Sequence, residues 1–424
     1  MEHIRSLTGI FFLLLLAWLM SNNKRKIPYR VIIWGMGLQI TFGLLILKTA
    51  PGHVMFQFLE DAFLRLMSFS DAGARFMFGD LMMGFAPADG SSFQLIDAST
   101  GHPADFAKIM SVYGPRFAFK VIPSIIFFAS LIAIFYHLGI MQRIVSAMAW
   151  VMSKTMGTSG GESLSASCNI FVGQSEAPLL IKPYIGKMTQ SELMAVMVGG
   201  FATIAGAVMV AYVTFGVDAG HLMAASVMSA PASLVMAKII FPETGESLTR
   251  GKVRLKVQKD TVNVVDAAAQ GAATGLKLAV NVAAMLIAFI ALIALVNHLL
   301  SFIGTTLNQV FGWVFSPIAF FIGVPLNEVL DIGQLLGTKI ALNEFVAYVD
   351  LTALKGTLSP RAFTIATYAL CGFANFSSIA IQIGGIGAIA PERKSDLARL
   401  GLRAMFGGAL ASWLTAAIAG AIVG

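Results

Sequence analysis

The sequence predicts an all-α integral membrane protein with eight transmembrane helices, two re-entrant helical hairpins and an inverted repeat. The first observation is composition: of 424 residues, 57% are hydrophobic and only 12% are charged, too few to cover the apolar surface of a water-soluble fold. The second is that the apolar residues stand in long runs. The third is that two parts of the chain carry the same pattern of interrupted apolar segments.

Eight apolar runs approach or exceed the ~20 residues that a helix needs to cross a hydrocarbon core of ~30 Å. They are residues 7–20, 31–47, 121–140, 193–213, 222–241, 276–300, 362–389 and 402–423. Two further apolar stretches, 160–181 and 311–342, contain Gly, Pro, Ser, Asn and Glu. These residues disfavour one straight helix, so we expect both stretches to enter the bilayer as hairpins.

The net charge of +7 does not indicate a nucleic-acid partner, because the basic residues form no face interleaved with aromatic side chains. They lie between the spans, as the positive-inside rule requires of a membrane protein. Lys24, Arg25, Lys26 and Arg30 follow the first span and place the N-terminus outside. Eight spans then return the C-terminus to the same side.

The N-terminal part of the chain has the character of a scaffold. Residues 1–155 hold three spans and two amphipathic pieces, 55–67 and 106–112, but no polar motif inside a span. We assign the charged loop and the sixth span, residues 242–307, to the same scaffold.

Two later segments, 156–241 and 308–424, are interpreted as related transport repeats. Each begins with an apolar stretch that Gly and Pro interrupt and that carries one carboxylate. Glu176 lies in the sequence GQSEAP of the first hairpin, and Glu328 lies in GVPLNE of the second. A carboxylate in hydrocarbon costs several kcal/mol, which favours a functional role, although either glutamate could also cap the second arm of its hairpin.

Each repeat continues into a span with a clear helix start. Residues 189–192 (TQSE) form a capping box, and residues 359–360 (SP) combine an N-cap with proline at the first helical position. A short signature follows in each span: GFAT, ending at Thr203, and GFAN, ending at Asn375. Because the two spans enter from opposite sides, both signatures are expected near the middle of the bilayer, as in inverted-repeat secondary transporters.

A second motif predicts a different chemistry. Residues 157–161 (GTSGG) match the serine motif of rhomboid-type intramembrane proteases, with Ser159 as nucleophile. Such an enzyme needs a histidine base, and the closest candidates, His137 and His298, lie only near span ends. The protease is therefore a distant alternative, and the chain is not expected to be an enzyme.

Four motifs resemble those of the concentrative nucleoside transporter family, in particular a bacterial sodium-coupled member. They are 173–178 (GQSEAP), 323–328 (GVPLNE), 343–348 (NEFVAY) and 371–378 (CGFANFSS), in the order of that family. The resemblance implies sodium-coupled nucleoside import across the inner membrane by alternating access. It also implies a homotrimer in the lipid bilayer with periplasmic termini. A proton-coupled carrier of nucleosides or of another small polar nutrient stays an alternative.

The resemblance also implies roles for particular residues. Hydrogen bonds to the nucleobase are assigned to Gln174, Ser175 and Glu176 at the tip of the first hairpin. Apolar walls are assigned to Val208 and Phe373, and bonds to the ribose hydroxyls to Glu328, Asn375 and Ser378. The co-transported sodium ion is assigned to Asn169, Val172, Thr203 and Ile204.

Overall fold

The structure is a computed structural model that describes residues 2–78, 117–174, 176–249 and 261–423, and within these ranges it contains helices and no strand. The predicted all-α class is therefore confirmed for the described residues. The expected amphipathic piece 106–112 lies outside them.

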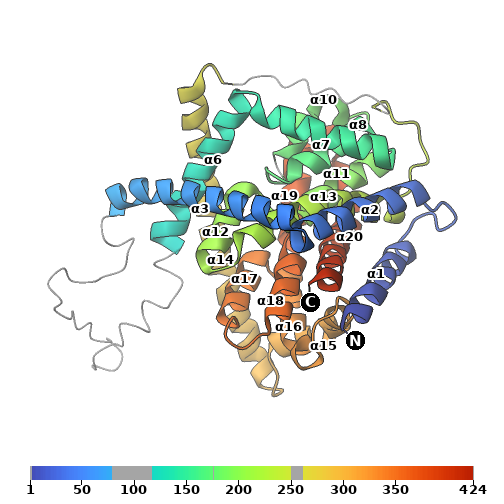
Figure 1. Cartoon of the computed structure of the whole chain (residues 1–424), viewed down its shortest axis with the longest axis vertical. Helices are drawn as coiled ribbons and strands as arrows, with labels where there is room; N and C mark the ends of the chain where they lie inside the picture. Colours follow the sequence, from blue (N-terminus) through green and yellow to red (C-terminus); the bar gives the residue numbers. More distant parts are fainter. Residues whose placement is uncertain (1, 79–116, 175, 250–260, 424) are drawn as a thin grey trace.

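The first third of the chain forms long helices that cross one another (Figure 1). They are α1 (Glu2–Leu19), α2 (Tyr29–Lys48), α3 (Ala50–Phe78), the π-helical turn η2 (Phe117–Val121), α6 (Ile122–His137) and α7 (Ile140–Met156). The amphipathic piece predicted at 55–67 lies within α3. Glycines set the ends of α7, because Gly139 and Gly157 both adopt the left-handed conformation, with φ of 78° and 75°.

The first repeat continues with short helices and then two longer spans. Its helices are α8 (Gly160–Asn169), α9 (Ala177–Leu180), α10 (Lys182–Ile185), α11 (Gln190–Ala202), α12 (Gly206–Phe215) and α13 (Ala219–Ile240). The capping box predicted before α11 is present, since Thr189 and Glu192 exchange both side-chain-to-backbone bonds.

Helix α14 (Val264–Ser301) lies in the predicted scaffold segment 242–307. The second repeat follows with α15 (Leu307–Phe321), η3 (Leu326–Glu328), α16 (Val329–Ala341), α17 (Glu344–Ala353), α18 (Pro360–Leu370), α19 (Phe376–Ile389), η4 (Pro391–Arg393) and α20 (Lys394–Ile422). The N-cap predicted at Ser359 is also present, because its side chain accepts from Ala362 N.

Among the described residues, seven helices are long and apolar enough to cross a membrane, and they coincide with seven of the eight predicted runs. The eighth run, 362–389, is divided into α18 and α19 by a break at residues 371–375. The span predicted at 193–213 is likewise divided, into α11 and α12. The first break follows the GFA residues of α11 directly and begins at Thr203, whereas the second break contains the whole GFAN signature.

The two hairpins lie at different ends of the molecule. In Figure 1, α8 and α10 lie at one end and α16 and α17 at the other. The second hairpin differs from the prediction, because it consists of α16 and α17 and turns at residues 342–343. The motif 323–328 is instead the turn between α15 and α16, where Gly323 has φ of 95°.

The helices of the repeats form the interior of the protein. In the most apolar window of residues Gln190–Phe215, 94% of the residues are buried, whereas in α14 only 11% are. Helices α6 and α14 pack along each other, with Gly271 and Gly275 against the backbone of α6. In contrast, α1 and α2 pack mainly on α13 and α20, so they belong spatially with the repeats.

Candidate substrate and ion site

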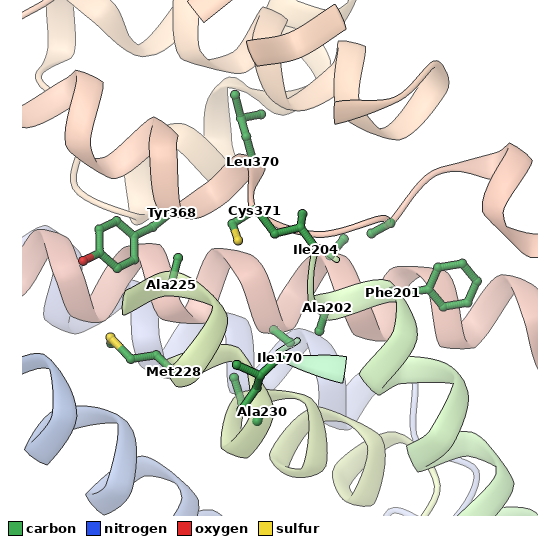
Figure 2. Close-up of a cluster of buried hydrophobic side chains, with 14 of the residues drawn as sticks. Ile170, Phe201, Ala202, Ile204, Ala225, Met228, Ala230, Tyr368, Leu370 and Cys371 are labelled. Atoms are coloured by element: carbon green, nitrogen blue, oxygen red, sulfur yellow. The ribbon is translucent and has the colours of Figure 1, made fainter. Parts of the chain in front are cut away.

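The two helix breaks touch each other at the centre of the molecule. The backbone N–H of Phe373 donates to Thr203 O at 3.3 Å, and Figure 2 shows Ile204 of the first break close to Cys371 of the second. Gly372 permits this crossing: its φ is 140°, and a Cβ atom there would lie 2.8 Å from Phe201 O. The breaks therefore form one junction in which they contact each other directly.

The tip of the first hairpin reaches this junction. Gly206 N at the start of α12 donates to Phe171 O at 3.0 Å, which joins the tip to the first break. The side chain of Gln174 donates to Ser378 Oγ at 2.9 Å and accepts from Gln382 Nε2 at 3.0 Å. The tip is thus held to α19 through a chain of side-chain amides and a hydroxyl. Glu176 is half-buried before α9, and Ser175 lies outside the described residues.

The tip of the second hairpin brings a buried carboxylate to the same place. Asn343 starts α17 as its N-cap by accepting from Val346 N at 3.0 Å, and the next residue is Glu344. Glu344 is 3% exposed. Its two oxygens accept from Tyr212 OH and from Asn375 Nδ2, each at 3.1 Å. A carboxylate in this interior depends on such donors, since desolvation disfavours its charge.

Asn375 connects the two hairpins. As the N-cap of α19, its Oδ1 accepts from Ser378 N at 2.9 Å and from Ser377 Oγ at 2.7 Å. These donors fix the amide so that its NH₂ group faces Glu344. A continuous polar chain, hereafter the polar chain, results; it comprises Gln382, Gln174, Ser378, Asn375, Glu344 and Tyr212.

Glu328 is not part of this constellation. Its oxygens accept from Ser359 N at 2.6 Å and from Ser359 Oγ at 2.7 Å. Ser359 starts α18, whose 11 residues extend about 16 Å before the break that carries Asn375. Glu328 therefore joins the starts of α16 and α18, and the structure does not bring it to Asn375 and Ser378 as the sequence prediction required.

The two predicted apolar residues lie beside the junction. Val208 is buried in the first turn of α12, and the partly buried Phe373 packs on the hydrophobic core within the second break.

The residues predicted for sodium gather where the first hairpin meets α11. Asn169 is the last residue of α8, and a Cβ atom on Gly199 in the last turn of α11 would lie 3.3 Å from its Nδ2. The side-chain NH₂ group of Asn169 donates to Ser165 O at 2.9 Å. Thr203 follows α11, and its hydroxyl donates to Gly199 O at 3.0 Å. Val172 and Ile204 are buried in the same region.

Two oxygens in this region have no hydrogen-bond partner among the described residues: Asn169 Oδ1 and Ser165 Oγ, both fully buried. Buried acceptors without donors are costly, and a hard cation is satisfied by such oxygens. The C-terminal end of α11 also carries partial negative charge. The described residues hold no cluster of three or more His, Cys, Asp or Glu, so the donor set is one of neutral oxygens.

The protease alternative finds no support at Ser159. Its hydroxyl accepts from Glu162 N at 3.4 Å, and Glu162 accepts in return from Ser159 N at 2.6 Å. This pair is a capping box that starts α8. In the part of the chain that the structure describes, no histidine is bonded to Ser159.

Comparison with known proteins identifies the class. Residues 8–81 match the family model "Na+ dependent nucleoside transporter N-terminus", and residues 221–420 match the corresponding C-terminus model. Residues 118–219 match a gate model described as "Nucleoside recognition". The chain belongs to the sodium-dependent nucleoside transporter family, whose members are membrane transporters and not enzymes.

Individual relatives support the assignment to this family. The chain is 43% identical to the uncharacterized transporter YutK of Bacillus subtilis, over 100% of both chains. It is 40% identical to the sodium/nucleoside cotransporter 1 of Mus musculus, with 99% of this chain covering 64% of that protein. Among solved structures, CNTnw in an inward-facing substrate-bound state aligns with TM-score 0.87 at 38% identity, covering 100% of this chain and 98% of CNTnw. A CNTnw variant in an outward-facing state aligns with TM-score 0.88.

The sequence prediction left out Glu344, Tyr212 and Gln382. Glu344 lies in the NEFVAY motif that helped to define the family resemblance, so its signal was present in the sequence. Tyr212 and Gln382 are single polar residues within apolar helices, and only their place beside the breaks indicates a role.

Proposed function

We propose that this protein is a symporter that carries nucleosides into the cell together with sodium, by alternating access. The observation that carries the proposal is the polar chain from Gln382 to Tyr212, which joins both hairpin tips and a broken helix next to the unpaired oxygens of Asn169 and Ser165. A nucleoside is neutral but rich in hydrogen-bonding groups, and this chain offers it both donors and acceptors.

Glu344 takes the role of ribose acceptor that the sequence prediction assigned to Glu328. Its carboxylate can exchange the bonds from Tyr212 and Asn375 for bonds from two ribose hydroxyls. Asn375 and Ser378 complete this side of the site, as predicted. A deoxynucleoside would leave a buried acceptor without its donor, at a cost of about 1–3 kcal/mol.

The nucleobase faces the first hairpin in this proposal. Gln174 bonds both Ser378 and Gln382 of α19. If the base replaces one of these partners, the bond to the other still holds the tip to α19. Ser175 and Glu176 are proposed to add contacts from the same tip. Val208 and Phe373 are proposed to pack on the base.

Sodium is proposed to bind through Asn169, Thr203 and the backbone of Val172 and Ile204. The unpaired Oδ1 of Asn169 supports this assignment. Sodium held there would fix the tip of the first hairpin against the first break, which in turn contacts the second break at Phe373. The ion would thereby order the substrate site, which is the coupling that a symporter requires.

The proposed arrangement in the membrane has eight spans and two re-entrant hairpins, with both termini periplasmic in a bacterial inner membrane. The protein is proposed to form a homotrimer. The exposed pair α6 and α14 suits a fixed frame within the predicted scaffold segments 1–155 and 242–307. Because α1 and α2 pack on α13 and α20, we assign these two helices to the moving part together with 156–241 and 308–424.

Uptake of radiolabelled uridine into proteoliposomes, with and without an inward sodium gradient, tests the proposal. We expect accumulation only with the gradient, and inhibition by other nucleosides. Uptake that follows a pH gradient and ignores sodium would favour the proton-coupled alternative, and no gradient-driven uptake would refute the symporter.

A further inference from the structure

Gln382 in α19 carries a buried side-chain oxygen without a donor. The residue is 1% exposed, and among the described residues no group donates a hydrogen bond to its Oε1. A buried acceptor without a donor is costly. In a site built to hold a polar solute, such an atom points to a donor that comes from the solute or from a water molecule.

The bonds that the Gln382 amide donates fix the direction of this oxygen. Its Nε2 donates to Met197 O at 3.1 Å and to Gln174 Oε1 at 3.0 Å. A backbone carbonyl can only accept, so the NH₂ group must face Met197 O of α11 and Oε1 must face away from it. Gly200 makes room for this arrangement, because a Cβ atom there would lie 2.7 Å from Gln382 Nε2 and 2.9 Å from Gln174 Cβ. The unpaired oxygen is therefore held in one orientation.

The place of Gln382 along the polar chain indicates which part of a nucleoside it meets. Ser378 and Gln382 are four residues apart in α19, so they lie on one face of the helix, about 6 Å apart along its axis. Gln174 at the tip of the first hairpin bonds to both. With the ribose at Asn375 and Ser378 and the base at Gln174, Gln382 lies at the edge of the base that is farthest from the ribose.

We propose that Gln382 Oε1 accepts a hydrogen bond from an exocyclic amino group on the base, so that Gln382 determines substrate specificity. The orientation of the nucleoside on which this rests is that of the proposed function. In cytidine the amino group is attached to the ring on the side away from the ribose, and it can donate to Oε1 without displacing the bonds of Gln382 Nε2. Uridine carries a carbonyl oxygen at the same position and gains no such bond. The preferred substrate is therefore a pyrimidine nucleoside with an amino group, and uridine binds less tightly.

Dissociation constants of cytidine and of zebularine, which is cytidine without its amino group, test this inference on the purified full-length protein in saturating sodium. Gln382→Met removes the amide and keeps an unbranched side chain of similar length. We expect the wild type to bind cytidine about tenfold more tightly than zebularine, which corresponds to about 1.4 kcal/mol. In Gln382→Met this ratio should fall to about one.

Ser378→Ala is the matched control. It removes the other side-chain bond between Gln174 and α19, from Gln174 Nε2 to Ser378 Oγ at 2.9 Å, and leaves Gln382 Oε1 in place. Both nucleosides should therefore bind more weakly while their ratio stays at about tenfold. If the ratio falls in Ser378→Ala as well, the orientation of Gln174 sets it, and the inference is overturned.

A Gln382→Met variant with the same ratio as the wild type would overturn the inference and leave the proposed function intact. A wild-type ratio of about one would do the same and would assign a water molecule to Oε1. A wild type that binds neither cytidine nor uridine would instead refute the proposed function. If Gln382→Met does not fold, as judged by size-exclusion chromatography, the wild type decides: a preference of about fivefold or more for cytidine over both zebularine and uridine supports the inference, and a smaller one contradicts it.

Discussion

The two repeats share one order of helices but differ in what they place at the junction of the breaks. The first contributes neutral oxygens from Asn169 and Thr203, and some of its buried acceptors have no donor among the described residues. The second contributes ionisable side chains, Lys339 and Glu344, with their partners in place. This difference is the basis on which we propose that the first repeat binds the ion and the second the neutral polar solute.

The starts of the hairpins show a second contrast. In the first repeat, Glu162 at the start of α8 lies 2.6 Å from Lys238, inside a network that also holds Glu243 and Ser191. In the second repeat, the hydrogen-bond partners of Glu328 among the described residues are the hydroxyl and N–H of Ser359. Both acids fix a hairpin to the rest of its repeat, so a carboxylate within an apolar stretch is not by itself evidence of a substrate site.

The largest effect on uridine uptake is expected at one of the two glutamates of the second repeat, Glu344, and not at the other, Glu328. Glu344→Ala should reduce uridine uptake at least about 100-fold, because two charge-assisted hydrogen bonds of about 1.5–3 kcal/mol each are lost from the substrate. Glu328→Ala, the matched control, should lower stability and retain uridine binding. Uridine dissociation constants for the two purified variants check this, and equal losses of affinity would remove the distinction between them.

The next effect concerns the first repeat. Asn169→Ala removes the unpaired Oδ1 and should raise the sodium concentration for half-maximal uridine uptake about tenfold, which corresponds to about 1.4 kcal/mol. Ser167→Ala is the control, since Ser167 lies on the same helix and bonds only Ser163 O at 2.9 Å. Sodium titrations of uptake measure both, and an unchanged titration for Asn169→Ala would contradict the assignment of the ion.

A smaller effect is expected at the contact between the first hairpin and α19. Gln382→Leu removes bonds to Gln174 Oε1 at 3.0 Å and to Met197 O at 3.1 Å. The loss of about 1 kcal/mol should weaken uridine binding about fivefold, because Gln174 is less well oriented. Sodium affinity should stay the same, and a change in sodium affinity alone would place Gln382 in the ion site instead.

The smallest functional effect is expected at the start of α18. Ser359→Ala removes the N-cap and the hydroxyl bond to Glu328, and should lower the free energy of unfolding by about 1–2 kcal/mol. Uridine affinity should be retained, since Ser359 lies a whole helix away from the break. Thermal unfolding of the detergent-solubilised protein, followed with a uridine-binding assay, measures both quantities, and lost binding at full stability would refute the structural role.

Much of this arrangement could be predicted from the sequence. Hydropathy located the spans, and capping signals correctly located the starts of α11 and α18. The GFAT and GFAN signatures marked the positions of both breaks: the first break begins at Thr203, and in the second Gly372 and the capping Asn375 interrupt the apolar run. The family resemblance assigned Gln174, Asn375 and Ser378 to one site, and in the structure they share the polar chain.

The tip of the second hairpin could not be located in this way. Gly323 and Pro325 form a strong turn signal, but that turn joins α15 to α16. The tip itself has neither residue: α17 starts at Asn343, which is extended with φ of −167° and caps the helix with its side chain. A single asparagine between two apolar helices is a weak signal, whereas Gly323 and Pro325 direct the sequence prediction to Glu328.

The uridine dissociation constant of the purified wild-type protein, measured against sodium concentration, tests the coupling of the two repeats most directly. We expect this constant to fall as sodium rises. We also expect the dependence to disappear in Asn169→Ala, while Glu344→Ala still binds sodium but not uridine. By linkage, uridine must tighten sodium binding by the same factor. A uridine dissociation constant that does not change with sodium would contradict the proposed coupling.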